Sequence, residues 1–330
     1  MADGTATAIR PTFDFGRIRR RLVSQEMVLF LTLITLFIVV GLINPRFLAE
    51  RNLSSVFLGN AYIAVAAIGM SMVIISGNID ISVGSLIGVL ATVSGTLALA
   101  GVPIVLCWLI PVALGMVATA FMGALVAYLR IPSIVVTLGM LSILKGGLIS
   151  VTKGAWLTDM PPGFFLSQVK LFGIPSPIYF MVILTFAAAL WMRLSATGRA
   201  IYAVGGNVEA ARLSGISPTA TIMKAFIIHG FFVGVAAVLF ATQLSVIQST
   251  VPPNLELTII TASVVGGVSI LGGTGTVIGS TLAAILLASI ASSMIFVNLS
   301  PFWMRAVQGI LILVTVLADL FRRQRQRGGR

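Results

Sequence analysis

Polar and ionisable side chains interrupt an apolar stretch at residues 76–85, which read SGNIDISVGS. A glycine breaks one helical pattern here, and Asp80 and Ser82 are residue types that commonly begin the next helix. Either Ser82 or Asp80 could therefore act as a helix N-cap near the inner surface, where the carboxylate of Asp80 also suits the helix dipole. It could equally line a polar path or its inner gate, together with Asn78, Ser82 and Gly84, because ionisable groups at membrane depth are usually functional. The residue types leave both roles open.

Three further ionisable residues are weaker candidates for the same path: Lys145, His229 and Glu256. Lys145 could instead snorkel to the outer headgroups, and a lone histidine on an apolar helix often packs in a core with its hydrogen bonds satisfied. His229 is the single histidine, so no second imidazole is present for a zinc site, and we predict no metal. The sequence contains no nucleophile with a positioned base and no carboxylate pair at a credible spacing. We therefore predict no catalytic residue and no cofactor.

A second polar and glycine-rich interruption lies at residues 266–279, which read GGVSILGGTGTVIG. It lacks the Gly-Lys-Ser or Gly-Lys-Thr of a phosphate-binding loop, so the chain does not bind ATP in that manner. LGGTGTVIGS at 271–280 aligns with SGNIDISVGS at 76–85 as a weak internal repeat, although chance matching in a glycine-rich chain is the alternative. Breaks at corresponding positions of two halves point to a substrate path in transporters. The path residues predicted here are Gly266, Gly267, Gly272 and Gly273.

A short polar helix is expected at residues 207–214, within the sequence GRAIYAVGGNVEAARLSGI. Asn207 is a suitable N-cap, and Gly215 is a suitable terminator. The small side chains of Ala210 and Ala211, beside Glu209, would let this helix dock closely into a groove on another protein. The alternative is a surface helix without a partner.

The elements that carry these residues are membrane helices, because 58% of the chain is hydrophobic and only 9% is charged. A soluble domain carries roughly 25% charged residues. Windows of about 20 apolar residues, the length that spans a bilayer core, predict an all-α bundle of about ten crossings. The spans are expected near 26–43, 56–76, 84–101, 103–128, 131–152, 177–194, 222–248, 257–272, 276–298 and 302–320. The short links near 76–84 and 272–276 could belong to broken or re-entrant helices.

The distribution of basic residues predicts the orientation of these spans. With the N-terminus inside, fifteen lysines and arginines fall on the inner side and four on the outer side, with two more inside spans. This asymmetry places both termini in the cytoplasm. Because the basic residues do not form one face, the net charge of +12 does not indicate a nucleic-acid partner. The first span lacks a convincing cleavage site, so we expect it to be retained as an anchor.

The expected organisation has three parts. A basic cytoplasmic segment at 1–25 precedes a single transmembrane domain at 26–320, and a basic tail follows at 321–330. The inner loop at 195–221 is the sizeable cytoplasmic connection. Membrane lipid surrounds the whole domain.

Four motifs in this order resemble the permease subunits of bacterial ABC importers for monosaccharides, the ribose, rhamnose and autoinducer-2 group. They are NIDISVGS at 78–85, IPSIVVTLGML at 131–141, ATGRAIYAVGGNVEAARLSGI at 196–216 and ELTIITASVVGGVSILGGTGTVIG at 256–279. The resemblance covers residues 26–320 and lies closer to the rhamnose and autoinducer-2 branch than to the ribose branch. It implies a multi-pass protein of the bacterial inner membrane that forms the path for a monosaccharide or a similar small polyol.

The resemblance also implies the partners of the chain. They are a cytoplasmic ABC ATPase, an extracytoplasmic sugar-binding protein and a second permease subunit, identical or paralogous. The core at Glu209, Ala210, Ala211 and Gly215 is similar to the loop helix through which ABC permeases couple to the ATPase, but no Leu-Pro follows it as in many importers. Thr258 stands where ribose-type members often carry Asp, so no charged role is transferred to that position.

Two other functions compete with this interpretation. An ion-coupled secondary carrier of about ten spans predicts carboxylates in the membrane core, and apart from Asp80 and Glu256 the predicted spans contain almost none. A membrane scaffold without transport would explain the hydrophobicity but neither the two broken segments nor the capped inner helix.

Overall fold

A computed structural model describes residues 25–250 and 252–328, with side chains described as far as residue 321. Almost all of this chain is helical, which confirms the all-α prediction. The long helices are α2 (Gln25–Ile43), α3 (Glu50–Ile75), α4 (Val83–Leu99), α5 (Ile104–Ala127), α6 (Ser133–Thr152), α7 (Ser176–Leu194), α10 (Pro218–Ala241), α12 (Val277–Phe296) and α13 (Met304–Gly328). The shorter ones are α8 (Ala196–Gly206), α9 (Val208–Leu213) and α11 (Leu255–Val265), with 3-10 turns η1 (Pro45–Leu48), η2 (Leu166–Gln168) and η3 (Pro301–Trp303).

Eight of the described helices are long and apolar enough to cross a membrane. The two shorter apolar helices, α4 and α11, occupy the remaining predicted spans, so the structure has an apolar helix in each of the ten expected places. These two helices are short because each follows or precedes a stretch of irregular backbone. Irregular backbone at membrane depth is tolerated where protein buries it or where it lines a cavity.

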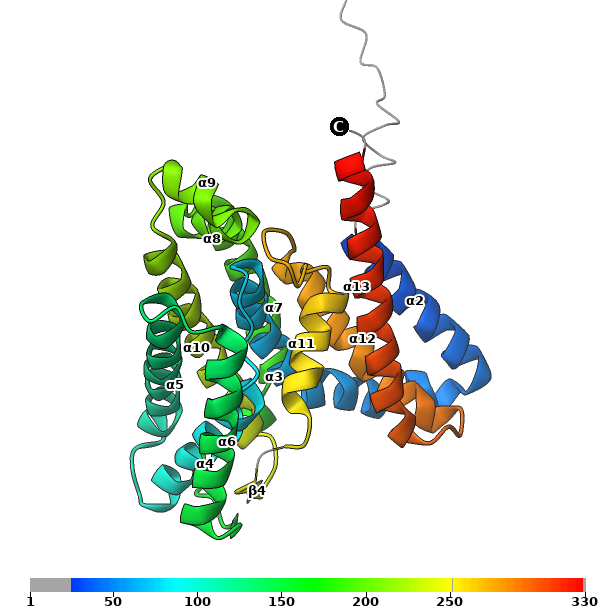
Figure 1. Cartoon of the computed structure of the whole chain (residues 1–330). Coiled ribbons are helices and arrows are strands. Elements are labelled where there is room, and N and C mark those ends of the chain that lie inside the picture. The colour runs from blue at the N-terminus through cyan, green and yellow to red at the C-terminus, as the bar shows by residue number, and fades with distance from the viewer. Residues whose placement is uncertain (1–24, 251, 329–330) are drawn as a thin grey trace, which may run out of the picture.

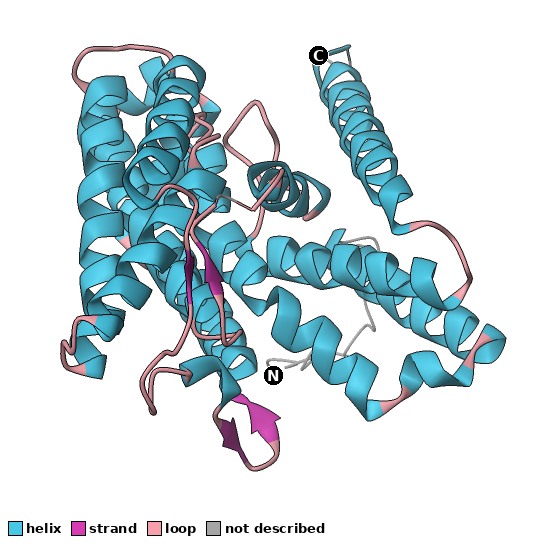
Figure 2. Cartoon of the chain, turned by 90° about the horizontal axis from the view of Figure 1, so that it is seen from below, coloured by secondary structure: helices cyan, strands magenta, loops and turns pink. Residues whose placement is uncertain are grey.

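The core of the bundle is built around α3, which is buried from Ile63 to its end at Ile75, and α10, which has buried residues along most of its length (Figures 1 and 2). Glycines bring α5 and α10 into backbone contact: a Cβ at Gly230 would lie 2.5 Å from the carbonyl oxygen of Gly115. Small residues at helix contacts are how membrane helices gain close packing. In contrast, no residue in the apolar window of α13 is buried by the rest of the described chain.

The outer end of the bundle carries four two-residue strands. β1 (Trp156–Leu157) pairs with β4 (Ile247–Gln248), and β2 (Lys170–Leu171) pairs with β3 (Ile174–Pro175). The predicted span at 222–248 is wrong at its end, because α10 stops at Ala241. The hydroxyls of Thr242 and Ser167 lie 2.8 Å apart at that point, and Ser167 also donates to Leu239, which fastens the outer loop to the end of α10.

The opposite end carries α8 and α9, together with the end of α13 (Figure 1). This arrangement matches the orientation predicted from the basic residues, with the inner loop and the end of α13 on one side. Residues 1–24 and the last two residues of the predicted tail lie outside the described chain. The predicted domain boundaries therefore stay predictions.

Candidate functional site

The polar segment at 76–85 is a true break between two helices. After α3 ends at Ile75, the chain continues without regular structure until α4 begins at Val83. Two side chains of α6 hold this break: the backbone N–H of Ile79 donates to Ser133 Oγ at 3.2 Å, and Thr137 Oγ1 donates to the Ile79 carbonyl at 3.4 Å. These contacts satisfy backbone groups that would otherwise be buried unpaired.

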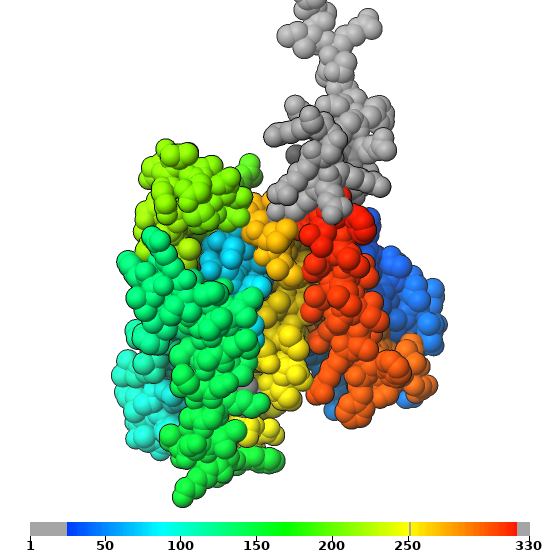
Figure 3. Space-filling view, in the orientation of Figure 1, coloured from blue at the N-terminus to red at the C-terminus, as the bar shows by residue number. Residues whose placement is uncertain are grey.

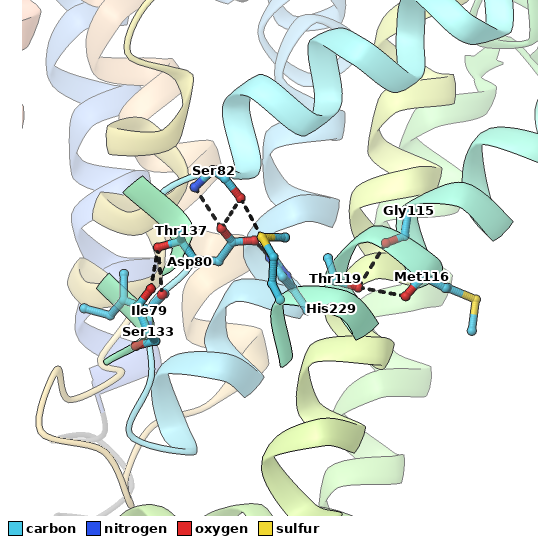
Figure 4. A network of polar contacts seen from close by, with 10 residues as sticks. Ile79, Asp80, Ser82, Gly115, Met116, Thr119, Ser133, Thr137 and His229 are labelled. Atoms are coloured by element: carbon cyan, nitrogen blue, oxygen red, sulfur yellow. Dashed lines mark hydrogen bonds and ion pairs between the residues drawn. The ribbon is translucent and has the colours of Figure 1, made fainter. Parts of the chain in front are cut away.

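Asp80 lies at the centre of a buried polar network (Figure 4). Its Oδ1 accepts hydrogen bonds from the backbone N–H of Ser82 at 2.8 Å and from the Ser82 hydroxyl at 2.5 Å. Its Oδ2 lies 3.1 Å from Nε2 of His229 on α10. Of the two N-caps that the sequence allows, Ser82 holds that position in α4, although its own side chain makes no capping bond. Asp80 supports the helix start instead, by accepting from the N–H and hydroxyl of Ser82.

His229 is fully buried, and this histidine–carboxylate pair was not foreseen from the sequence. The two residues are 149 positions apart, so no local pattern relates them. A glycine on α3, Gly69, makes room for the ring, since a Cβ there would lie 2.8 Å from His229 Nδ1. Nδ1 has no hydrogen-bond partner in the described structure. The Nε2–H tautomer satisfies this geometry best, because it donates to Asp80 and leaves an acceptor rather than a donor unpaired.

The two halves of the weak internal repeat touch one another. The N–H of Gly273 donates to the carbonyl of Ile75 at 2.8 Å, and a Cβ at Gly272 would lie 3.0 Å from the Cα of Gly77. Gly205 of α8 also packs here: it lies so close to the carbonyl oxygen of Ile75 that a Cβ at this position would clash with it. The two breaks and the inner loop therefore share one junction, which we call the glycine junction: Ile75, Gly77, Gly205, Gly272 and Gly273.

The other end of the second break packs equally closely. Gly266, which follows α11, lies against Gly279 and Ser280 at the start of α12, leaving no space for a side chain. Gly267 has a φ of +99°, a conformation in which glycine is not strained, and this turn ends the helix at Val265. The predicted span at 257–272 therefore contains a helix only in its first half.

The first turns of α4 and α11 meet inside the bundle. A Cβ at Gly84 would lie 2.5 Å from Oε2 of Glu256 and 2.9 Å from its backbone nitrogen. Two residues further along α11, Thr258 Oγ1 accepts a hydrogen bond from Gln308 Nε2 of α13 at 3.2 Å. Helix N-termini carry partial positive charge and attract polar groups. Glu256, Thr258 and Gln308 are each half-buried, and α11 lies recessed between α6 and α13 (Figure 3).

The predicted path residues thus fall into different surroundings. Asn78, Asp80, Ser82, Gly84, Gly266 and Gly272 are buried, whereas Gly267, Gly273 and Glu256 are half-buried. Lys145 is exposed on α6, outside the network around Asp80. The structure brings Asp80, Ser82 and His229 together, and separately Gly84 with Glu256.

The inner loop folds into two helices that present a small surface at the cytoplasmic end. Asn207 Oδ1 accepts from the N–H of Ala210 at 3.0 Å, and Gly215, with a φ of +78°, follows the C-cap Ser214. This is the short capped helix expected from the sequence. Ala211 is buried beneath the helix. Glu209 and Arg212 form an exposed ion pair at 3.5 Å.

Leu213 completes this surface, and sequence reasoning missed it. Its side chain is 89% exposed at the end of α9. A large apolar residue displayed on a charged cytoplasmic helix is a typical anchor for a protein partner. The sequence does contain a signal for it: Leu213 is a large apolar residue at the end of a short helix whose other residues are mostly polar or small.

Tyr202 fastens α8 to the second break. Its hydroxyl donates to the carbonyl of Gly275 at 2.9 Å. Burial, and to a smaller extent the nearby charge of Glu26, raises the pKa of this phenol above its ordinary value of 10.0. The phenol therefore stays protonated, and able to donate, throughout the physiological pH range.

Comparison with known proteins decides the family. The family model described as "Branched-chain amino acid transport system / permease component" matches residues 52–316, which contain both breaks and α9. The chain belongs to this permease family. The autoinducer 2 import system permease protein LsrC of Yersinia pseudotuberculosis serotype O:3 is 35% identical over 90% of this chain and 85% of its own length. LsrC of Enterobacter sp. strain 638 and of Salmonella typhi are each 34% identical over 90% of this chain and 87% and 86% of theirs.

Membership of the permease family confirms several predictions. The chain is a transport subunit and not an enzyme, and its apolar helices agree with a multi-pass protein of the bacterial inner membrane. The similarity to autoinducer-2 permeases confirms the resemblance to the monosaccharide importer group. No solved structure matches the chain.

Proposed function

We propose that this chain is the membrane permease of an ABC importer for a monosaccharide or a similar small polyol, with autoinducer-2 as the first solute to test. The observation that carries the proposal is the sequence similarity over nine tenths of the chain to permeases of autoinducer-2 import systems. The capped cytoplasmic helix α9 and two broken crossings that meet at one junction support it. An importer permease of this class works with a separate ATPase and an extracytoplasmic binding protein.

In this proposal the chemistry of ATP hydrolysis takes place outside the chain. ATP binding draws two ATPase subunits together, and α9 receives their motion through Glu209, Arg212 and Leu213. A second permease subunit, identical or paralogous, faces α11, where α6 and α13 leave it recessed. The solute passes the polar groups near Gly84 and Glu256, and it binds them weakly because affinity resides in the binding protein.

Co-purification and uptake test the proposal together. The tagged chain, purified from its own host in detergent, should retain an ATPase. Proteoliposomes that contain this complex and the binding protein should then take up autoinducer-2, D-ribose or L-rhamnose only when ATP is inside. Uptake driven by a proton or sodium gradient without ATP, or a purified chain that binds one of these sugars tightly by itself, would contradict the proposal.

The charge of Asp80 gives a separate prediction within this system. Asp80→Asn keeps one oxygen for Ser82 but replaces the carboxylate oxygen that faces His229 with an amide nitrogen. The imidazole then either opposes the amide with its own Nε2–H or changes tautomer and leaves a buried Nδ1–H without a partner. In both cases one buried donor is unsatisfied, which costs about 1–3 kcal/mol. We expect ATP-dependent uptake to fall about tenfold, measured against Asp159→Asn, a change of the same kind at an exposed outer residue. Wild-type uptake by Asp80→Asn would remove any role for the charge.

A further inference from the structure

The contact between Asp80 and His229 joins the break at 76–82 to α10, the helix that follows α9 in the chain. α9 ends at Leu213, and α10 begins at Pro218 with Ser217 as its N-cap. His229 lies twelve residues beyond Ser217, which is about 18 Å along a helix with a rise of 1.5 Å per residue. We propose that the Asp80–His229 pair is the link that transmits the displacement of α9, through α10, to residues 78–82. This inference rests on the proposed function and assigns to His229 a positioning role rather than contact with the solute.

α10 is suited to carry such a displacement as a rigid body. It is an uninterrupted helix of 24 residues, with its one proline at the first position, where proline is tolerated. Its glycines lie against the backbone of α5, so the two helices are locked side by side. A movement applied at the cytoplasmic end of α10 therefore reaches His229 with little loss, because packed interiors transmit strain.

The break is held from two sides, by α6 and by α10. Ile79 is hydrogen-bonded to Ser133 and Thr137 on α6, whereas Asp80 is bonded to His229 on α10. α6 lies at the periphery, with most of its side chains outside the protein core, and α10 lies at the centre. A shift of α10 relative to α6 must therefore either stretch the Asp80–His229 bond or draw residues 78–82 along. Both side chains are fully buried, so breaking the bond would leave buried polar groups unpaired, and the segment follows at a lower cost.

Two substitutions of His229 separate this role from a purely structural one. A glutamine amide nitrogen reaches the position of imidazole Nε2, so His229→Gln keeps a donor for Asp80. An asparagine amide nitrogen lies near the position of Nδ1, so His229→Asn keeps a polar residue of similar size but loses the link. We expect His229→Gln to retain uptake within twofold. For His229→Asn we expect uptake to fall about tenfold while ATP hydrolysis, which takes place on another subunit, continues near the wild-type rate.

The deciding measurement is hydrogen–deuterium exchange of the complete permease–ATPase complex, with and without vanadate trapping. In the wild type and His229→Gln, trapping should change exchange in both 208–213 and 78–86. In His229→Asn the change in 208–213 should remain and the change in 78–86 should disappear. A wild-type response of 78–86 in His229→Asn would overturn the link. If His229→Asn does not assemble, Asp80→Ala, which removes the partner of His229 Nε2, is measured in its place with the same criterion. A wild-type complex without ATP-dependent uptake contradicts the proposed function itself, and the link falls with it.

Discussion

Replacing Leu213 by aspartate should separate the permease from its ATPase while leaving the membrane domain folded. The leucine side chain is 89% exposed on α9, so folding depends little on it. Burial of a leucine in a partner groove contributes about 1.5–3 kcal/mol. Loss of this burial should weaken association by about 10- to 150-fold, since 1.4 kcal/mol corresponds to tenfold. The aspartate charge placed in the groove should weaken it further.

The measurement is retention of the ATPase on the tagged chain in detergent, followed by ATP-dependent uptake. Leu171→Asp is the matched control, because Leu171 is also an exposed leucine but lies in the outer loop, at the opposite end of the bundle. It should leave ATPase retention unchanged. Equal retention by Leu213→Asp and the wild type would show that α9 does not dock the ATPase through this residue.

Replacing Gly205 by alanine should have an equally large effect, in this case on the fold. A Cβ at Gly205 would run into the carbonyl oxygen of Ile75 and would lie 2.8 Å from the backbone nitrogen of Gly273. Both obstacles are backbone, so no side chain can turn aside, and the hydrogen bond between Gly273 and Ile75 would have to open. Overpacking of this kind costs about 1–3 kcal/mol or more. We expect a thermal unfolding midpoint several degrees lower and uptake below one tenth of wild type.

The next residue supplies the control for this prediction. At Gly206 a Cβ would meet its nearest neighbour, the Cα of Gly273, at an ordinary distance of 4.0 Å. Both glycines end α8, so the two substitutions raise helix propensity alike and differ only in the space available. Gly206→Ala should therefore unfold and transport like the wild type. If the two variants behaved alike, α8 would not pack on the glycine junction.

These two predictions describe one route from α9 into the membrane. α8 presses on the glycine junction, where both breaks meet, and α10 reaches the first break through His229. Tyr202 adds a third contact, to the carbonyl of Gly275 in the second break. A movement of α8 and α9 would therefore reach both breaks at once, as alternating access by two halves requires.

Local patterns along the chain were enough for much of this protein. Apolar runs of membrane length gave the crossings, basic residues at their ends gave the orientation, and Asn207 with Gly215 gave the limits of a short helix. Each of these depends on residues within one or two turns of one another. Glycine and polar residues also marked where α4 and α11 would be shortened, although not where each helix would end.

Only the tertiary structure decided what the broken segments touch. Asp80 and His229 are 149 positions apart, and Gly84 meets Glu256 across a similar separation. Hydropathy treats all faces of an apolar helix alike, so it cannot say which face of α10 turns toward the break. The rotation of α10 is set by close backbone packing at its glycines, because contacts at such short range allow few arrangements of the helices. The sequence by itself determined a polytopic permease with two polar interruptions, and the packing of the helices decided that these interruptions meet each other and the coupling loop.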